Sequence, residues 1–204
     1  MGANVEELTG LQNHAALKAT LKQQVEAEQT VALAVLDIDK FMAVNEQHGH
    51  DVGDALLRHL AEMLKQAFPG QAYRVSGDEF AVLLPGASLE SAFLRLEAFR
   101  SRVESAAGQL PVAATVTAGV AQYPRDARTV QSLLQAADAA LVAAKEGGRN
   151  QVALPPTEEM VMKSCYYPAA SIRRLKSAAE RVGRKESELL REALADLLRK
   201  YDRP

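Results

Sequence analysis

The sequence contains a single cysteine, Cys165, and no long hydrophobic run. One thiol excludes an intrachain disulfide framework and is typical of a reducing compartment. No apolar stretch approaches the roughly 20 residues that cross a bilayer, and residues 1–6 lack the pattern of a signal peptide. These absences predict a soluble cytoplasmic protein with no membrane contact.

Net charge is also small, at −2 for 204 residues, but it is unevenly divided. Residues 1–160 carry 13 Lys and Arg against 20 Asp and Glu, a net of −7, whereas residues 161–204 carry 11 against 6, a net of +5. An acidic body with a basic tail indicates two modules with different partners. The Pro-Pro-Thr-Glu-Glu run at 155–159 lacks apolar periodicity, so we predict a first domain over 1–154, a linker over 155–160 and a second domain over 161–204.

Apolar periodicity predicts alternating strands and helices in the first domain. Strands are expected over 31–38, 112–123 and 151–154, with a hairpin over 72–84. Helices are expected over 11–28, 41–48, 51–68, 89–106 and 130–146. This order favours an antiparallel-rich sheet with helices packed against it, which is an α+β architecture.

Acidic side chains follow two of these strands. Asp37 and Asp39 come after the apolar run 31–36, and Asp78 and Glu79 occupy the hairpin turn beside a glycine. A carboxylate at the end of a buried strand is unfavourable unless a cation or a donor meets it, and a carboxylate pair beside glycine suits a hard cation and a phosphate. Taken alone, the turn is more typical of a solvated hairpin, and Asp39 is best interpreted as a helix-capping residue. Two acidic strand ends that could share one metal ion nevertheless form a candidate site.

The hairpin also resembles a known family. Arg74-Val-Ser-Gly-Asp-Glu-Phe80 is similar to the signature turn of GGDEF domains, the diguanylate cyclases that condense two GTP into cyclic di-GMP. Further blocks agree in order and spacing, namely Leu8–Asn13, Leu36–Phe41 followed by Asn45, Gly49 and Gly53, Thr117–Val120, and Ala136–Asn150. The resemblance covers about residues 1–155 and implies the palm-like, ferredoxin-like sheet of nucleotidyl cyclases with packed helices.

The resemblance implies a role for each residue that matches a family motif. Asp37, the main-chain carbonyl of Ile38 and Asp78 would hold Mg²⁺ or Mn²⁺. Asp78 and Glu79 would be catalytic, with Glu79 next to the reacting 3′-hydroxyl. Hard cations between carboxylates and a triphosphate suit phosphoryl transfer.

Substrate-binding residues follow from the same resemblance. Asn45 and Asp54 would bind guanine, because an amide and a carboxylate together satisfy its O6 acceptor and its N1 and N2 donors, which favours GTP over ATP. Phe41, Lys145 and Arg149 would bind the phosphates. Without the family, Asn45 and Asp54 are polar side chains on helix surfaces, and Lys145 and Arg149 suit the end of a helix dipole.

Some positions depart from the family pattern. Ser76 replaces the first glycine of the signature and adds a Cβ near the phosphates, and Met42 replaces a lysine that binds phosphate in many active members. The other replaced positions are His14, Glu46 and Val142, where the family usually has Arg, Asp and Tyr. Ala67–Gly70 stands in place of the Arg-x-x-Asp motif, so product inhibition through that motif is not expected.

The tail resembles a ribbon-helix-helix domain, most clearly over Gly183–Leu194. A strand is predicted over 161–167 and helices over 171–182 and 186–201, each helix with one apolar face. About 44 residues cannot bury these faces alone, so a homodimer is expected. In that family two strands pair across the dimer, and many members insert this ribbon into the major groove of double-stranded DNA.

Contact of the tail with DNA is an open alternative. The candidate contact residues are Lys163, Ser164, Tyr166, Arg184 and Lys185. The side chains expected to face the groove are those of Met162, Ser164 and Tyr166, and none is a usual bidentate reader of bases.

Two functions are therefore compatible with the sequence. In one, the tail holds together a dimeric diguanylate cyclase by raising the local concentration of the second catalytic domain; intact Asp37, Asp78 and Glu79 favour it. In the other, a catalytically weak or inactive domain that binds GTP or cyclic di-GMP regulates a DNA-binding transcription factor, and Met42 favours it. A protein-interaction adaptor built on both folds is a third alternative.

Overall fold

The computed structural model describes residues 4–106, 108–156 and 166–201. The chain divides into two compact units, Met1–Thr157 and Glu158–Pro204, which we describe separately. Across the described ranges, no helix combines the length and the apolar character that a membrane span requires.

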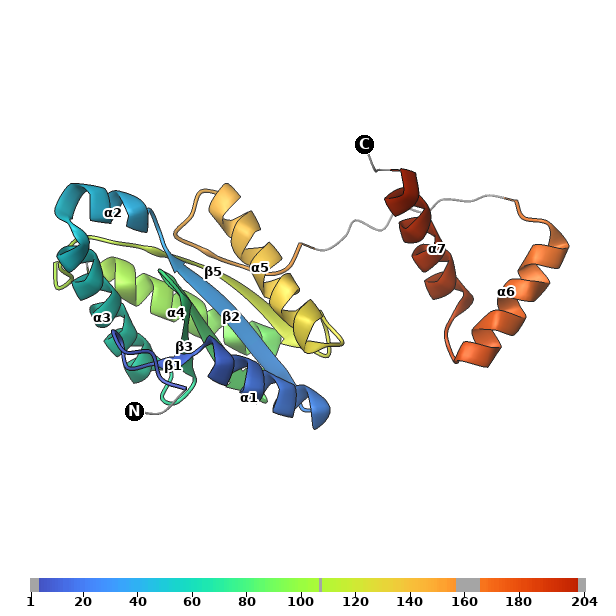
Figure 1. Ribbon diagram of the computed structural model, residues 1–204, viewed down its shortest axis with the longest axis horizontal. Helices are drawn as coiled ribbons and strands as arrows, with labels where there is room; N and C mark the ends of the chain where they lie inside the picture. Colours follow the sequence, from blue (N-terminus) through green and yellow to red (C-terminus); the bar gives the residue numbers. More distant parts are fainter. Residues whose placement is uncertain (1–3, 107, 157–165, 202–204) are drawn as a thin grey trace. The chain divides into compact units, whose positions relative to one another are not determined.

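The first unit is built on a mixed sheet with the strand order β1-β3-β4-β2-β5-β6 (Figure 1). The strands are β1 (Gln12–Asn13), β2 (Val31–Ile38), β3 (Ala72–Ser76), β4 (Glu79–Pro85), β5 (Val116–Tyr123) and β6 (Val152–Ala153). The central strand β2 runs antiparallel to both β4 and β5, whereas the short β1 and β6 pair in parallel with β3 and β5. The predicted α+β architecture with an antiparallel-rich sheet is confirmed.

Helices cover both faces of this sheet (Figure 1). They are α1 (His14–Glu26), α2 (Phe41–His48), α3 (His50–Ala67), α4 (Leu89–Ser105) and α5 (Val130–Glu146). Helices α3 and α4 pack on the face of β2 that carries Ala34 and Leu36, and α1 and α5 pack on the face that carries Leu33 and Val35. Because alternate residues of a strand point to opposite faces, a strand buried on both sides is apolar throughout, as β2 is.

Helix α5 approaches β5 very closely, and this approach positions part of the candidate site. A Cβ atom on Gly119 of β5 would lie 2.2 Å from the carbonyl oxygen of Ala137 and from the nitrogen of Leu141. Only glycine admits this contact, which is why the alanine-rich face of α5 can lie directly on the strand. The last turn of α5, with Lys145, is thereby held near the end of β2.

Most element bounds agree with the prediction, and one difference matters for the site. Strand β2 and helices α2 and α5 occupy the predicted ranges, whereas β5 begins at Val116 and not at 112. The carbonyl of Thr115 accepts a hydrogen bond from the main-chain N–H of Asp39 at 3.0 Å, just beyond the end of β2. The segment before β5 then lines a cavity instead of extending the sheet.

The described part of the second unit contains helices α6 (Ala169–Val182) and α7 (Glu186–Tyr201). Gly183 follows α6 with φ of +66°, and the main-chain N–H of Arg184 donates to the carbonyl of Ala179 at 3.1 Å. This is the left-handed helix end that the glycine predicts.

The apolar faces of these two helices are largely uncovered. Val182, Leu194 and Leu197 are 52%, 55% and 51% exposed. The strand predicted over 161–167 falls mainly on residues 161–165, which lie outside the described residues, and residues 166–168 form no strand. The ribbon-helix-helix fold and its dimer therefore stay predictions.

Candidate active site

Two strand ends bring acidic side chains together at the centre of the sheet. Asp37, near the end of β2, lies in register with Glu79 at the start of β4, and Asp78 precedes it in the β3–β4 turn. Burial raises the pKa of Asp37, and the nearby carboxylates of Asp78 and Asp39 raise it further. The residues expected to bind a metal and to catalyse the reaction are thus neighbours in space.

Lys145, in the last turn of α5, faces this acidic cluster. Its Nζ lies 2.8 Å from Oδ2 of Asp37. Burial raises the pKa of Asp37 and has the larger effect, whereas the hydrogen bond from Lys145 lowers this pKa. Lys145 is therefore paired with a carboxylate, although the family resemblance assigns it to phosphate.

The β3–β4 turn is fixed by its own side chains. Gly77 has φ of +38°, in the left-handed region that glycine adopts readily. Nε and Nη2 of Arg74 donate to the carbonyl of Gly77 at 3.1 and 2.7 Å, and Oγ of Ser76 donates to Oε2 of Glu79 at 3.1 Å. Ser76 thus orients Glu79. The sequence comparison with the family pattern, in which Ser76 replaces a glycine, did not indicate this role.

Glu79 lies in an environment that favours its protonated form. Burial raises the pKa of Glu79, the hydrogen bond from Ser76 lowers it, and the carboxylates of Asp138 and Asp37 raise it again. A buried carboxylate with a raised pKa is a stronger base than an exposed one, so Glu79 is suited to accept a proton. Asp138 was not among the predicted residues, although it lies seven residues before Lys145 and so on the same face of α5.

The donor chemistry around Asp37 fits a hard divalent cation. Carboxylate and main-chain carbonyl oxygens are the ligands that Mg²⁺ and Mn²⁺ prefer, and Asp37, Ile38 and Asp78 supply them at neighbouring strand ends. Burial is the main cause of the raised pKa of Asp37, and the carboxylates of Asp78 and Asp39 add to it, so a bound cation would stabilise the ionised form. In the part of the chain that the structure describes, no three acidic, His or Cys side chains are arranged to hold a metal, so substrate phosphates would complete the ligand set.

The two residues predicted to bind guanine, Asn45 of α2 and Asp54 of α3, lie where these two helices adjoin. A Cβ atom on Gly53 would lie 1.9 Å from Oδ1 of Asn45, so only glycine permits this approach. Oδ1 of Asn45 is buried without a hydrogen-bond partner in the described chain, whereas Oδ2 of Asp54 lies 3.9 Å from Arg58. A buried acceptor without a partner is destabilising until a ligand supplies a donor, and the ring N1–H and the exocyclic amino group of guanine are such donors.

The phosphate-binding candidates lie around the start of α2. Phe41 is the first residue of α2, and Lys40 before it has φ of +57°. Arg149 is exposed with φ of +65°, and Met42 is 76% exposed. Because Met42 carries no charge, an anion here would depend on Lys40, Arg149, Lys145 and the main-chain N–H groups at the start of α2.

The interpretation of Asp39 as a helix cap is wrong. The residue that precedes α2 is Lys40, and its side chain makes no capping hydrogen bond. Asp39 is only 8% exposed, and its carboxylate accepts hydrogen bonds from the hydroxyls of Thr115 and Thr117 at 2.6 and 2.5 Å. Donors from distant parts of the chain, and not the adjacent helix, therefore satisfy this buried carboxylate.

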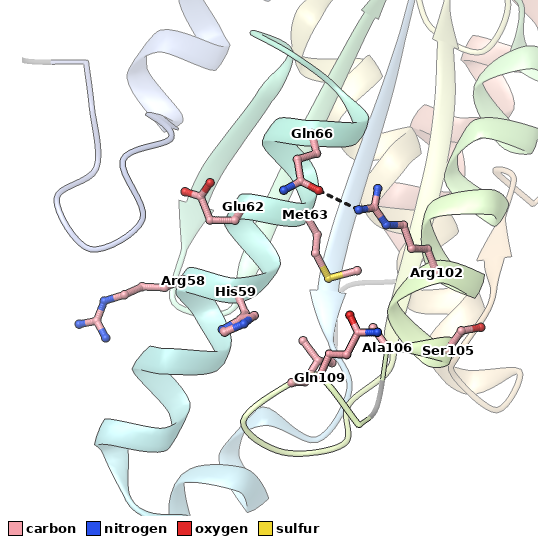
Figure 2. A pocket seen from close by; sticks show the side chains of 10 residues that line it. Arg58, His59, Glu62, Met63, Gln66, Arg102, Ser105, Ala106 and Gln109 are labelled. Carbon is pink, nitrogen blue, oxygen red and sulfur yellow. Dashed lines mark hydrogen bonds between the residues drawn. The ribbon is translucent and has the colours of Figure 1, made fainter.

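Two cavities lie near these elements. One of about 650 Å³ is lined in part by Lys40, Arg149 and Asn150 and adjoins the phosphate-binding candidates. The other, of about 530 Å³, lies between α3 and α4, where Gln66 accepts a hydrogen bond from Arg102 at 2.7 Å (Figure 2). Neither of these two is lined by the catalytic candidates.

The structure describes only part of the predicted DNA-contact set. Tyr166 and Lys185 are exposed, and Arg184 pairs with Glu192 at 2.5 Å. Lys163 and Ser164 lie outside the described residues. DNA contact by the tail is therefore untested by the geometry.

Comparison with known proteins shows which family the chain resembles. The family model described as "Diguanylate cyclase, GGDEF domain" matches residues 3–151. The uncharacterized protein YhcK of Bacillus subtilis is 36% identical over 168 residues, which are 77% of this chain and 47% of that protein. Diguanylate cyclase DgcP of Pseudomonas aeruginosa is 34% identical over 159 residues, which are 74% of this chain and 24% of that protein.

A solved structure gives the same result. The GGDEF domain of DgcB from Caulobacter crescentus, in complex with c-di-GMP, superposes with a TM-score of 0.67 at 33% identity over 75% of this chain and 96% of that one. The chain spans about half, or less, of the length of the two curated relatives above. The matched residues 3–151 include β1 to α5 and all the residues of the candidate site. On this basis the chain belongs to the family of GGDEF domains.

Proposed function

We propose that this protein is a dimeric diguanylate cyclase that joins two GTP molecules into cyclic di-GMP and releases two pyrophosphates. The observation that carries the proposal is the pairing of Asp37 with Glu79 on neighbouring strands, both with raised pKa values. The relative DgcP is a diguanylate cyclase, and the DgcB domain is in complex with c-di-GMP. Both similarities support the same chemistry for this chain.

Guanine binds between α2 and α3. The buried Oδ1 of Asn45, which has no partner in the described chain, accepts a hydrogen bond from one of the two donors on the guanine edge, the ring N1–H and the exocyclic 2-amino group, and Asp54 accepts from the other. Adenine does not present these two donors on the same edge, so GTP is preferred over ATP.

The carboxylates act on the reacting phosphate. Asp37, the carbonyl of Ile38 and Asp78 would hold Mg²⁺ or Mn²⁺, which would neutralise charge on the phosphates. Binding of the triphosphate draws Lys145 away from Asp37. Glu79 accepts the proton of the 3′-hydroxyl as its oxygen bonds to the α-phosphorus of the other GTP and pyrophosphate leaves.

Each product molecule contains two nucleotides, so two first units must face each other. The exposed Leu194 and Leu197 of α7 provide an apolar surface that a second copy of the chain covers in a two-fold dimer. A short linker between such a dimer and the first units raises their effective concentration. The tail thus acts as a clamp for the catalytic pair.

Met42 favours a second candidate function. Without a lysine at this position, the domain binds GTP or cyclic di-GMP with little turnover and regulates DNA binding by the tail. The net charge of +5 over residues 161–204 supports attraction to DNA phosphates.

One experiment separates the two functions. The full chain is incubated with GTP and Mg²⁺, and the products are identified by chromatography, with Asp78→Ala as the control and circular dichroism to verify its fold. Cyclic di-GMP from the wild type alone supports the cyclase. GTP binding by calorimetry without any product rules out the cyclase and supports the regulator.

A further inference from the structure

The carboxylate of Asp39 joins three segments that are far apart in the sequence. Its Oδ2 accepts from the hydroxyl of Thr115 at 2.6 Å and from the main-chain N–H of Asn150 at 3.1 Å, and its Oδ1 accepts from the hydroxyl of Thr117 at 2.5 Å. The N–H of Asn150 is shared with Oγ1 of Thr117, at 2.9 Å. Both oxygens of Asp39 are therefore occupied by donors, which distinguishes it from Asp37 two residues earlier.

The segment that Asp39 holds has an unusual backbone. Arg149 and Asn150 have φ of +65° and +46°, so two successive residues other than glycine are in the left-handed region. This region is unfavourable for residues with a Cβ atom, and contacts from outside the turn must maintain it. The bond from the N–H of Asn150 to Asp39 is one such contact.

The side chain of Asn150 is anchored on the other side, to α4. Its Oδ1 accepts from Nη1 of Arg100 at 2.9 Å, and its Nδ2 donates to Oε1 of Glu104 at 2.8 Å. Arg100 is itself paired with Glu104 and Glu97, at 2.8 and 2.9 Å. The turn is thus fixed at its backbone by the end of β2 and at its side chain by α4.

Arg149 is the residue that this arrangement presents to solvent. It directly precedes Asn150, its main-chain N–H donates to the carbonyl of Ala144 at 3.1 Å, and its side chain lines the same cavity as Lys40. Because Met42 provides no charge, the direction in which Arg149 points determines whether its charge adds to those of Lys40 and Lys145 at a triphosphate.

We propose that Asp39 is a positioning residue for triphosphate binding. Through the N–H of Asn150 it holds the turn in the conformation that directs Arg149 toward the β- and γ-phosphates, and it does not bind the metal. The inference rests on the proposed function in one respect, that GTP is the nucleotide bound.

The amide variant Asp39→Asn tests this with little change in shape. An amide has one acceptor oxygen for three donors and no charge, so at least one charge-assisted hydrogen bond is lost. Calorimetry on the full chain compares the affinities for GTP and GMP, which share the guanine contacts and differ in the phosphates. The matched control is Asp51→Asn, which changes an exposed carboxylate on α3.

We expect Asp39→Asn to weaken GTP binding about tenfold and to change GMP binding less than about twofold. In an Arg149→Ala background, Asp39→Asn should cause no further loss of GTP affinity, because its effect passes through Arg149. Thr115→Val removes one hydroxyl donor to Asp39 and should show the same selective loss to a smaller degree. It also provides the comparison if Asp39→Asn does not fold.

Three results would overturn the inference. Equal losses for GTP and GMP would indicate a merely structural role for Asp39. A full additional loss in the Arg149→Ala background would show that Asp39 acts by another route. Unchanged GTP affinity in Asp39→Asn would disprove the positioning role of Asp39 and leave the proposed function intact. Absence of GTP binding by the wild type would disprove both.

Discussion

The ammonium group of Lys145 lies 2.8 Å from Oδ2 of Asp37. This ion pair joins the last turn of α5 to the end of β2 and stabilises the ionised form of a carboxylate whose pKa is raised by burial. The positive charge therefore prepares Asp37 for a cation before any ligand arrives. In the proposed enzyme, the same lysine becomes a phosphate ligand once the triphosphate is bound.

Replacing Lys145 by methionine should raise the pKa of Asp37 further above its ordinary value. The hydrogen bond and the positive charge of Lys145 both lower this pKa, so their removal leaves burial and the neighbouring carboxylates unopposed. Carbon-detected NMR titration of the Asp37 carboxyl group measures the change. Lys22→Met, at an exposed lysine 3.7 Å from Glu26, is the control. An unchanged titration of Asp37 in Lys145→Met would contradict the prediction.

Replacing Ser76 by glycine, the residue usual in the family, should raise the pKa of Glu79. Burial raises this pKa already, and the hydroxyl of Ser76 acts in the opposite direction. If Glu79 must be deprotonated to act as a base, the acidic limb of the pH–kcat profile moves to higher pH. Ser76→Ala should move the limb equally, because both variants remove the hydroxyl. A shift to lower pH in either variant would disprove the role of Ser76.

Replacing Gly53 by alanine should abolish guanine recognition without unfolding the protein. The new Cβ would lie 1.9 Å from Oδ1 of Asn45 and displace the amide, whereas alanine inside α3 raises helix propensity by about 1 kcal/mol. We expect at least about a tenfold loss of GTP affinity by calorimetry and an unchanged or slightly higher melting temperature. Gly108→Ala, with nothing within 4 Å of the new Cβ, is the matched control. GTP binding at wild-type strength would show that Asn45 does not contact guanine.

Replacing Glu6 by glutamine should destabilise the protein at neutral pH but not in acid. Burial alone raises the pKa of Glu6, but hydrogen bonds from Thr9, the main-chain N–H of Leu8 and Arg74 lower it from 4.5 to about 2. A carboxyl group with a lowered pKa stabilises the fold above pH 4.5 and loses this effect as pH falls toward 2. Urea unfolding should give a loss of about 2 kcal/mol at pH 7 that shrinks below pH 4.5.

The control for Glu6 is Glu7→Gln, at the exposed neighbouring carboxylate. A loss of stability that does not depend on pH would mean that Glu6 contributes through its shape and packing, not through its charge.

Replacing Leu194 by glutamate should separate the proposed dimer. Leu194 is 55% exposed on α7, and a charge at this position prevents burial against a second copy. Size-exclusion chromatography with light scattering should show a dimer for the wild type and a monomer for the variant, with cyclase activity reduced about tenfold or more at equal concentration. Lys200→Glu, also exposed on α7, should leave the dimer intact. A dimeric Leu194→Glu protein would place the interface elsewhere.

Local sequence determined the elements of the first unit and placed its carboxylates at the ends of strands. The short, fully apolar run of β2 is typical of a strand buried on both faces, and its polar end at Asp37 indicates an edge of the core. The hairpin around Gly77 follows from turn chemistry, which places Asp78 and Glu79 at its tip. These features depend on residues close together in the chain, which is why the pattern sufficed.

Only the tertiary structure decided what these carboxylates contact. Asp39 resembled a helix cap because α2 begins two residues later, but its partners are 76, 78 and 111 residues away. The contact of Lys145 with Asp37 depends on the close approach of α5 to Gly119, which no local pattern expresses. A buried charge must be satisfied by hydrogen-bond donors that lie next to it in the packed fold. The periodicity of the sequence predicts which face of an element is buried, but it does not predict which distant residue contacts that face.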